Sequence, residues 1–308
     1  MRFMMPLPSP VAPASLPARS ANQNSRLALK DTVPAGHKAG AAGSVAGFTL
    51  IELIVVMMLV GILSGIVAMF IRNPLDAYMA AARRAALVDA ADTALLRIAR
   101  DVQAALPNSL RITQSAGITY LEFLPLQDGG RYRAEQTGAG TGDILDFTSG
   151  ADASFDVLGP TVSAAAGQYL VLYNLGLDAS TSAWLGGNRR AVTSSGTVSN
   201  LAFTATGAPL PLESPSKRFY LAGAPVTYVC DPGNGELRRV SGYALQAAQP
   251  TSFGAATSRL LANHVVTCAF AYDPGASQRL GQFTLRLQLS QDGETVTLYR
   301  EVAVNNDP

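Results

Sequence analysis

One carboxylate stands out near the start of the chain because its neighbours are almost all apolar. Residues 48–71 are apolar except for Thr49, Glu52 and Ser64. A segment of this length can cross a bilayer as a helix. A carboxylate inside such a segment costs about 2.5 kcal/mol or more to insert, so it usually has a partner or a function. Burial of the Glu52 charge therefore makes sense only if a cation meets it.

The two cysteines offer a different chemistry, a covalent cross-link. Cys230 and Cys268 lie far beyond the apolar segment and lack the Cys-x-x-Cys spacing of metal and redox sites. In a domain exported across the inner membrane, two such cysteines are candidates for a disulfide. We predict this bond, and two buried free thiols are the alternative.

The remaining polar residues form no catalytic constellation. His264 is the only histidine after residue 47, and we interpret it as a strand residue near Cys268. Asp231, Asn234 and Glu236 surround two glycines, and their spacing favours a hairpin turn over a calcium site because it is not that of an EF-hand loop. We expect no catalytic residue, no metal and no cofactor.

The charge pattern gives no sign of a nucleic-acid partner. The net charge is only +1, and the chain has no basic stripe. Three basic pairs are scattered along it, and we interpret them as solvated faces: Arg83-Arg84, Arg189-Arg190 and Arg238-Arg239.

Residues 1–47 form a basic leader rich in Pro, Ala and Ser. Its charges sum to 5 − 1 = +4, from Arg2, Arg19, Arg26, Lys30 and Lys38 against Asp31. Basic residues ahead of a span tend to stay in the cytoplasm, so we expect the body after residue 71 on the periplasmic side. A secretory signal is cut after its apolar core. Here the small residue, Gly47, precedes the core, so cleavage there would leave the span on the mature protein.

The stretch Gly47-Phe48-Thr49-Leu50-Ile51-Glu52 resembles the class III signal of type IV prepilins and type II secretion pseudopilins. In that family a prepilin peptidase cuts after a glycine and methylates the new terminus, usually a phenylalanine. A glutamate four residues further on is the family hallmark. The resemblance implies cleavage between Gly47 and Phe48, N-methylation of Phe48, and pairing of Glu52 with the amino terminus of a neighbouring subunit. The alternative is a plain membrane anchor, and the leader is longer than most in the family.

A helix is expected to continue beyond the membrane to residue 106. Apolar residues recur there at steps of three and four, which indicates one apolar stripe. Its members are Leu75, Tyr78, Ala82, Ala85, Val88, Ala91, Leu95, Ile98, Val102 and Leu106. We expect Pro74 to kink the helix or to begin its second part, and Pro107 to stop it. Arg97 and Asp101 are spaced for an exposed ion pair.

Glycine spacing and further short motifs refine this interpretation. Gly61 and Gly65 form a Gly-x-x-x-Gly pair, which is either a close helix-packing face or simply two glycines in a membrane helix. The segments after the span are similar to minor pilin-like proteins of the mannose-sensitive haemagglutinin (MSHA) pilus system. They are Phe70-Ile71-Arg72-Asn73-Pro74, Tyr78, Ala82-Arg83-Arg84-Ala85, residues 89–95, residues 97–101 and Leu106-Pro107-Asn108-Ser109.

The rest of the chain, residues 107–308, has the pattern of a β-rich domain. Alternating or apolar runs bounded by turn residues predict strands. They cover residues 118–124, 143–147, 169–173, 198–204, 218–221, 226–230, 236–240, 264–272, 283–289 and 295–304. Asp128-Gly129-Gly130 is predicted as a turn, and residues 134–165 and 176–216 as long loops.

These observations predict an α+β protein of type IV pilin-like fold, with a long helix, half of it transmembrane, packed on an antiparallel β-rich domain. Its expected parts are a cleaved cytoplasmic leader (1–47), the helix (48–106, in the membrane over 48–71) and a periplasmic or extracellular domain (107–308). The resemblance implies a non-catalytic minor pilin that acts in initiation or at the tip of a filament. The implied partners are prepilin peptidase, other pilins, the inner-membrane assembly platform and membrane lipid. A type II secretion pseudopilin and an anchored periplasmic enzyme are the alternatives.

Overall fold

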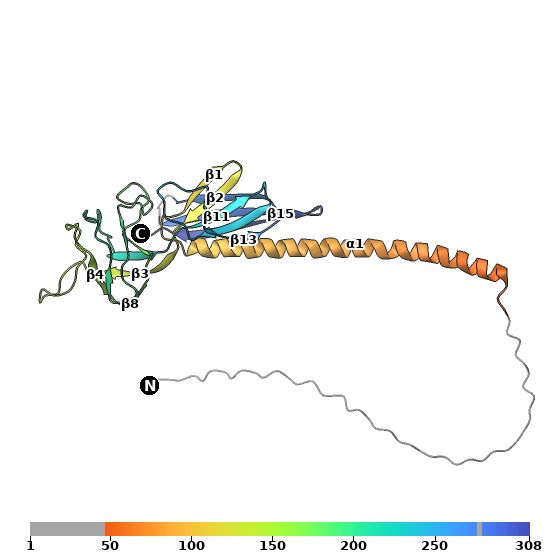
Figure 1. Ribbon diagram of the computed structural model, residues 1–308, viewed down its shortest axis with the longest axis horizontal. Helices are drawn as coiled ribbons and strands as arrows, with labels where there is room; N and C mark the ends of the chain where they lie inside the picture. The colour runs from red at the N-terminus through yellow and green to blue at the C-terminus, as the bar shows by residue number, and fades with distance from the viewer. Residues whose placement is uncertain (1–46, 276–278) are drawn as a thin grey trace, which may run out of the picture. The chain divides into compact units, whose positions relative to one another are not determined.

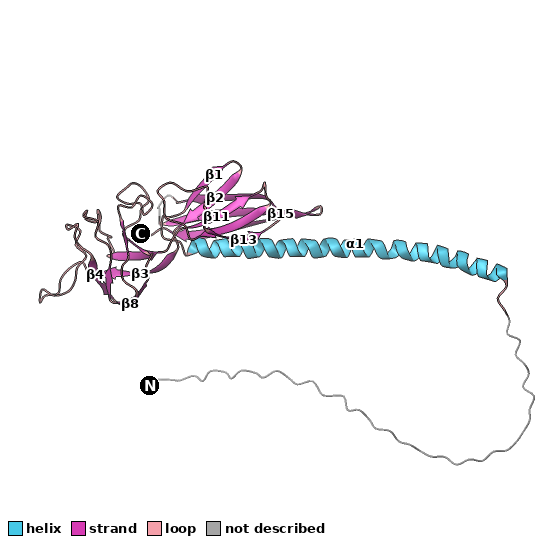
Figure 2. Ribbon diagram, viewed as in Figure 1, coloured by secondary structure: helices cyan, strands magenta, loops and turns pink. Residues whose placement is uncertain are grey.

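The computed structural model describes residues 47–275 and 279–308. Apart from Gly47, the predicted leader lies outside these residues. The chain divides into two compact units between Ile62 and Leu63, and helix α1 (Leu50–Gln103) contributes residues to both. The second unit holds every strand that the structure describes, as Figure 2 shows. An α+β protein with an apolar amino-terminal helix of pilin type and an antiparallel β domain is therefore confirmed.

The strands form four antiparallel sheets (Figure 1). The five-stranded sheet has the order β1 (Arg111–Ser115), β2 (Ile118–Phe123), β11 (Val226–Asp231), β12 (Glu236–Ser241) and β13 (Thr257–Ala262). The six-stranded sheet has the order β7 (Arg189–Ala191), β6 (Tyr169–Val171), β10 (Arg218–Ala222), β3 (Leu126–Tyr132), β4 (Ser154–Leu158) and β9 (Asn200–Ala202). The three-stranded sheet contains β14 (Val265–Asp273), β15 (Leu280–Gln291) and β16 (Glu294–Asn305), and the two-stranded sheet β5 (Val162–Ala164) and β8 (Gly196–Val198).

Helix α1 passes through Pro74 without ending and stops at Gln103, three residues before the predicted end. The chain leaves the helix there because its backbone forms hydrogen bonds with the segment that joins β2 to β3. The Leu106 amide donates to the Leu124 carbonyl, and the Leu126 amide donates to the Ala104 carbonyl. These bonds satisfy backbone groups that a helix end would otherwise leave unpaired.

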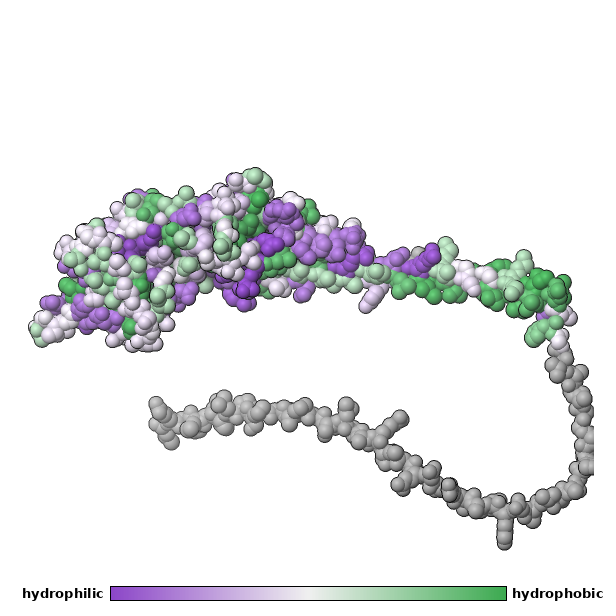
Figure 3. Space-filling view, viewed as in Figure 1, coloured by the Kyte–Doolittle hydropathy of each residue, from purple (hydrophilic) through white to green (hydrophobic). Residues whose placement is uncertain are grey.

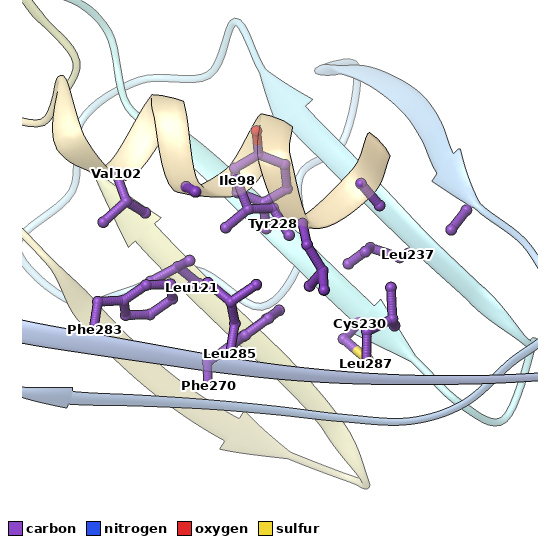
Figure 4. Packing of buried hydrophobic residues seen from close by; sticks show 14 of the residues in the cluster. Ile98, Val102, Leu121, Tyr228, Cys230, Leu237, Phe270, Phe283, Leu285 and Leu287 are labelled. Carbon is purple, nitrogen blue, oxygen red and sulfur yellow. The ribbon is translucent and has the colours of Figure 1, made fainter. Parts of the chain in front are cut away.

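The last four turns of α1 pack on the five-stranded and three-stranded sheets. Ile98 and Val102 are fully buried, in one apolar cluster with Tyr228 and Phe283 (Figure 4). The predicted stripe is correct from Ala91 onward. Its earlier part is wrong, because Leu75, Tyr78 and Val88 are exposed. The buried face also takes in three residues outside the stripe, Leu87, Ala94 and Ala99.

Ion pairs along the same helix connect it to the strands. Arg84 bonds Glu294 at 2.7 Å, and Asp92 accepts from Arg300 at 3.0 Å. Asp101 accepts from the Tyr228 hydroxyl at 2.8 Å and from the Arg239 guanidinium at 2.9 Å.

The predicted Arg97–Asp101 pair is present, with Arg97 exposed and Asp101 half-buried. The two residues do approach within 3.9 Å, but the principal partners of Asp101 are in β11 and β12. Burial, followed by the charge of Asp101, raises the pKa of Tyr228, so this phenol stays protonated and donates.

A second apolar cluster lies within the six-stranded sheet and the loops around it, where the structure corrects three predictions. Asp128-Gly129-Gly130 is not a turn but the middle of β3. A Cβ on Gly130 would come within 3.1 Å of the Phe219 ring, which shows why a glycine stands in this strand. Residues 143–147 are not a strand, since they form a segment with no regular structure. The predicted loops contain the short strands β4, β5, β7, β8 and β9.

Cys230 of β11 and Cys268 of β14 form a disulfide, with their Cα atoms 6.4 Å apart. This confirms the predicted pairing. The bond links the five-stranded sheet to the three-stranded sheet. Cys230 itself lies in the cluster that α1 covers (Figure 4). The disulfide closes a separation of 38 residues.

Candidate processing and assembly site

The amino-terminal end of α1 holds the residues that the sequence singled out. Gly47 and Phe48 precede the helix, and Glu52 lies in its first turn. Thr49 begins the helix, because its hydroxyl accepts from the Glu52 amide at 3.3 Å and its carbonyl from the Leu53 amide at 3.2 Å. A threonine three residues before a glutamate is the sequence pattern of a helix start.

Thr49 is the residue that the sequence prediction missed at this site. The signal was present, since Thr-x-x-Glu precedes the apolar run. The cap places Glu52 at the third helical position, where the positive end of the helix dipole favours a carboxylate. The same end of the helix therefore stabilises this charge in part before any other chain is present.

Gly47 has no role in the fold that the structure reveals. A Cβ built on it would have no neighbour within 4 Å among the described residues. A larger residue would thus fit at this position as far as the described residues are concerned.

The helix after Glu52 presents apolar side chains on every side. Its large hydrophobic residues up to Ile71 are exposed, and the segment is largely green in Figure 3. Within the described residues, α1 is the one helix long and apolar enough to cross a membrane by length and composition. Gly61 and Gly65 have no atom within 4 Å of an added Cβ, so their surfaces are open to close approach by another helix.

Elsewhere in the described part of the chain, polar clusters hold the fold together. No group of three or more His, Cys, Asp and Glu side chains suited to a metal occurs among those residues. His264 is not in a strand but in the turn before β14, with φ at 59°. Asp231 and Asn234 bond each other within the hairpin turn, and Glu236 pairs with Arg238.

Two of the basic pairs are not solvated faces as predicted. Arg190 is 5% exposed and donates to the carbonyls of Gly187, Arg189 and Ala208, and Arg239 bonds Asp101. Burial lowers the pKa of Arg190. These arginines brace loops and strands, a use of guanidinium groups that spacing along the sequence does not reveal.

A buried carboxylate, Glu122, has no counterpart in the sequence prediction. It is fully buried and accepts from Arg111 at 2.6 Å and from the Tyr243 hydroxyl at 2.7 Å. Burial raises its pKa above the ordinary value, although the bonds from Arg111 and Tyr243 oppose this shift. Arg111 also stacks on the Trp184 ring, 3.7 Å from its centroid. The network joins β1, β2 and the loop after β12.

Comparison with protein families adds one finding at the amino-terminal site. Residues 44–68 match the family described as the prokaryotic N-terminal methylation motif. This range contains Gly47, Phe48, Thr49 and Glu52 together with most of the apolar segment. Comparisons with curated proteins and with solved structures found no match. This motif and the one long apolar helix among the described residues support a membrane-anchored protein with a type IV pilin-like amino terminus.

Proposed function

We propose that this chain is a prepilin-like substrate that prepilin peptidase cuts between Gly47 and Phe48 and methylates on Phe48. The match of residues 44–68 to the N-terminal methylation motif carries this proposal. The open surroundings of Gly47 support it, because a glycine that the fold does not need is accounted for by an enzyme that reads it. Residues 1–47 are then a cytoplasmic leader that the mature protein lacks.

The mature protein is a non-catalytic subunit that assembles with other pilins. Its span, residues 48–71, holds it in the inner membrane with the β domain in the periplasm, and assembly carries it into the extracellular pilus. Glu52 pairs with the methylated amino terminus of a neighbouring subunit, because a carboxylate in a membrane segment needs a cation. The implied partners are prepilin peptidase, other pilins, the inner-membrane assembly platform and lipid. Nucleic acid has no place among them.

Within that class we propose a minor pilin of an MSHA-like type IV pilus, similar to MshO, that acts in initiation or at the tip. The short segments between residues 70 and 109 support this assignment. So does the size of the β domain, whose 16 strands among the described residues suit a terminal subunit better than a repeating shaft subunit. A minor pseudopilin of a type II secretion system shares the amino-terminal motif. The genes beside this one decide between them, since they encode either pilus or secretion components.

The test is to express the full chain with and without the matching prepilin peptidase and to determine the mass of the amino-terminal peptide. A product that begins with N-methylated Phe48 is expected only when the peptidase is present. Gly47→Arg should block cleavage without affecting the fold, whereas Gly61→Ala, also without neighbours around the new Cβ, should be cut normally. An unprocessed wild-type chain in the presence of the peptidase would refute the proposal.

Assembly needs a separate readout. Glu52→Val should be cleaved but should not enter complexes with partner pilins. Ser64→Val is the matched control, because it also removes a polar group from the apolar segment. Normal incorporation of the Glu52 variant, measured by co-purification with cross-linked partner subunits, would exclude the pairing role.

A further inference from the structure

A groove crosses the six-stranded sheet over β3 and β10, where no element of the proposed assembly function acts. It has a volume of about 310 Å³. It is lined by Leu126, Gly129, Gly130, Arg131, Arg218, Phe219 and Tyr220. β3 and β10 are antiparallel neighbours in the sheet.

Two arginines face each other across this groove. Arg131 of β3 and Arg218 of β10 are directly paired in the register, and both are exposed. Like charges at directly opposite positions destabilise a sheet. Arg218 shares its charge with Asp307 at 3.3 Å, whereas Arg131 has no carboxylate partner among the described residues. The pairing of Arg131 with Arg218 therefore lowers the stability of the sheet, and the fold itself does not explain it.

The floor of the groove is kept low by a glycine. Gly129 lies opposite Tyr220, and a Cβ on it would meet the Phe219 carbonyl oxygen at 3.0 Å and the Tyr220 ring at 3.2 Å. Glycine inside a strand often marks a place where a ligand or another backbone comes close. Here the missing side chain leaves the Tyr220 ring as one wall beside the two arginines.

We propose that this groove binds an organic carboxylate, which bridges Arg131 and Arg218 and lays its carbon body on Gly129 and Tyr220. Directly opposite residues in an antiparallel pair have Cα atoms about 4.5–5.5 Å apart, so two guanidinium groups reach one oxyanion. A guanidinium group and a carboxylate are both planar, so they can form two parallel hydrogen bonds with each other. The side-chain-free floor and the tyrosine wall favour a carboxylate on a flat body over a free phosphate.

Asp307 is a built-in competitor in this arrangement. Its carboxylate occupies Arg218, and both side chains are about half exposed, so an incoming carboxylate can displace it. Removal of the Asp307 charge should therefore strengthen binding, while removal of either arginine should weaken it. Substitutions at one site that change the affinity for the carboxylate in opposite directions distinguish ligand binding from a purely structural role.

The test titrates the full chain in detergent with galacturonate, with a capped glutamate peptide and with inorganic phosphate at equal ionic strength. Calorimetry should show carboxylate binding that Arg131→Gln weakens about tenfold, the loss of one charge-assisted contact. Asp307→Asn should tighten it, and Arg286→Gln, an exposed arginine of β15, should leave it unchanged. Binding of galacturonate alone identifies a sugar acid as the source, and binding of the peptide alone identifies an acidic protein partner.

The stability of the unliganded chain supplies an independent readout. In low salt, Arg131→Gln should raise the midpoint of thermal unfolding, because it relieves the opposition of like charges, and added salt should reduce the gain. Three results would overturn the proposal: carboxylate affinity equal in wild type and Arg131→Gln, a lower midpoint in that variant, or binding of phosphate without binding of either carboxylate.

Discussion

Removal of the Cys230–Cys268 bond should destabilise the β domain by about 4 kcal/mol. The bond closes a separation of 38 residues, and the chain-entropy relation gives this value at 25 °C for a loop of that length. Domains are typically stable by roughly 5–15 kcal/mol, so the loss is a large share of the total. The double variant Cys230→Ala/Cys268→Ala removes the bond. Reduction of the wild-type protein removes it without changing the packing.

Urea unfolding followed by tryptophan fluorescence measures the effect, because Trp184 is the single tryptophan and is buried beside Arg111. Reductant should lower the free energy of unfolding of the wild type by about 4 kcal/mol. It should leave the double variant unchanged. Free thiols that are alkylated before reduction would refute the bond. A reductant effect below about 1 kcal/mol would refute the loop-entropy argument, since the predicted value is several times larger.

Three further outcomes test the packing and the electrostatics. Ile98→Ala should cost about 2–5 kcal/mol in urea unfolding because Ile98 is fully buried, whereas Val88→Ala, on the exposed part of α1, should cost less than about 1 kcal/mol. Asp101→Asn should lower the free energy of unfolding by about 1–3 kcal/mol, because it leaves the half-buried Arg239 without a carboxylate. An equal loss in the control Asp307→Asn, at an exposed aspartate, would contradict this. Burial raises the pKa of Glu122 above 4.5, so the folded state binds this proton more tightly than the unfolded chain. The free energy of unfolding contributed by this group should then fall as pH rises above 4.5, and Glu122→Gln should lack this decline across pH 4–7.

The amino-terminal methylation motif was predictable because its information is local. Gly47, Phe48 and Glu52 lie within six consecutive residues, and the apolar segment follows without interruption. The helix itself and the final β15–β16 hairpin also follow from periodicity over a dozen residues or more. The disulfide was predictable from the number of cysteines and the expected compartment.

The extent of the buried face along α1 was only partly predictable. The apolar stripe continues from Leu75 to Leu106 in sequence, but the sheets cover the helix only from Leu87 onward. An apolar side chain such as Tyr78 satisfies the helical pattern equally well whether it packs in its own domain or stays exposed. Periodicity identifies the apolar face of a helix, but it does not show along how much of the helix a sheet covers that face.

Contacts between distant segments were beyond the reach of sequence patterns. Asp101 and Tyr228 are bonded across 127 positions, and Gly130 lies in a strand because the Phe219 ring fills the space of its side chain. In the sequence alone, a Gly-Gly pair after an aspartate favours a turn. Only the position of the Phe219 ring shows why glycine stands in a strand here. The strands β7, β8 and β9 have three residues each, too few for an alternating pattern to appear.

The core beneath α1 has a consequence for the order of events during synthesis. Ile98 shares its cluster with Val302 of the final strand, so the chain makes about 200 further residues before this face of the helix is closed. At bacterial synthesis rates of about 5–20 residues per second, that interval lasts roughly 10–40 s. During this interval the apolar helix face lacks part of its cover, and Cys268, the partner of Cys230, is made only late in it. The apolar face of α1 can therefore be fully closed only after the final strand has been made.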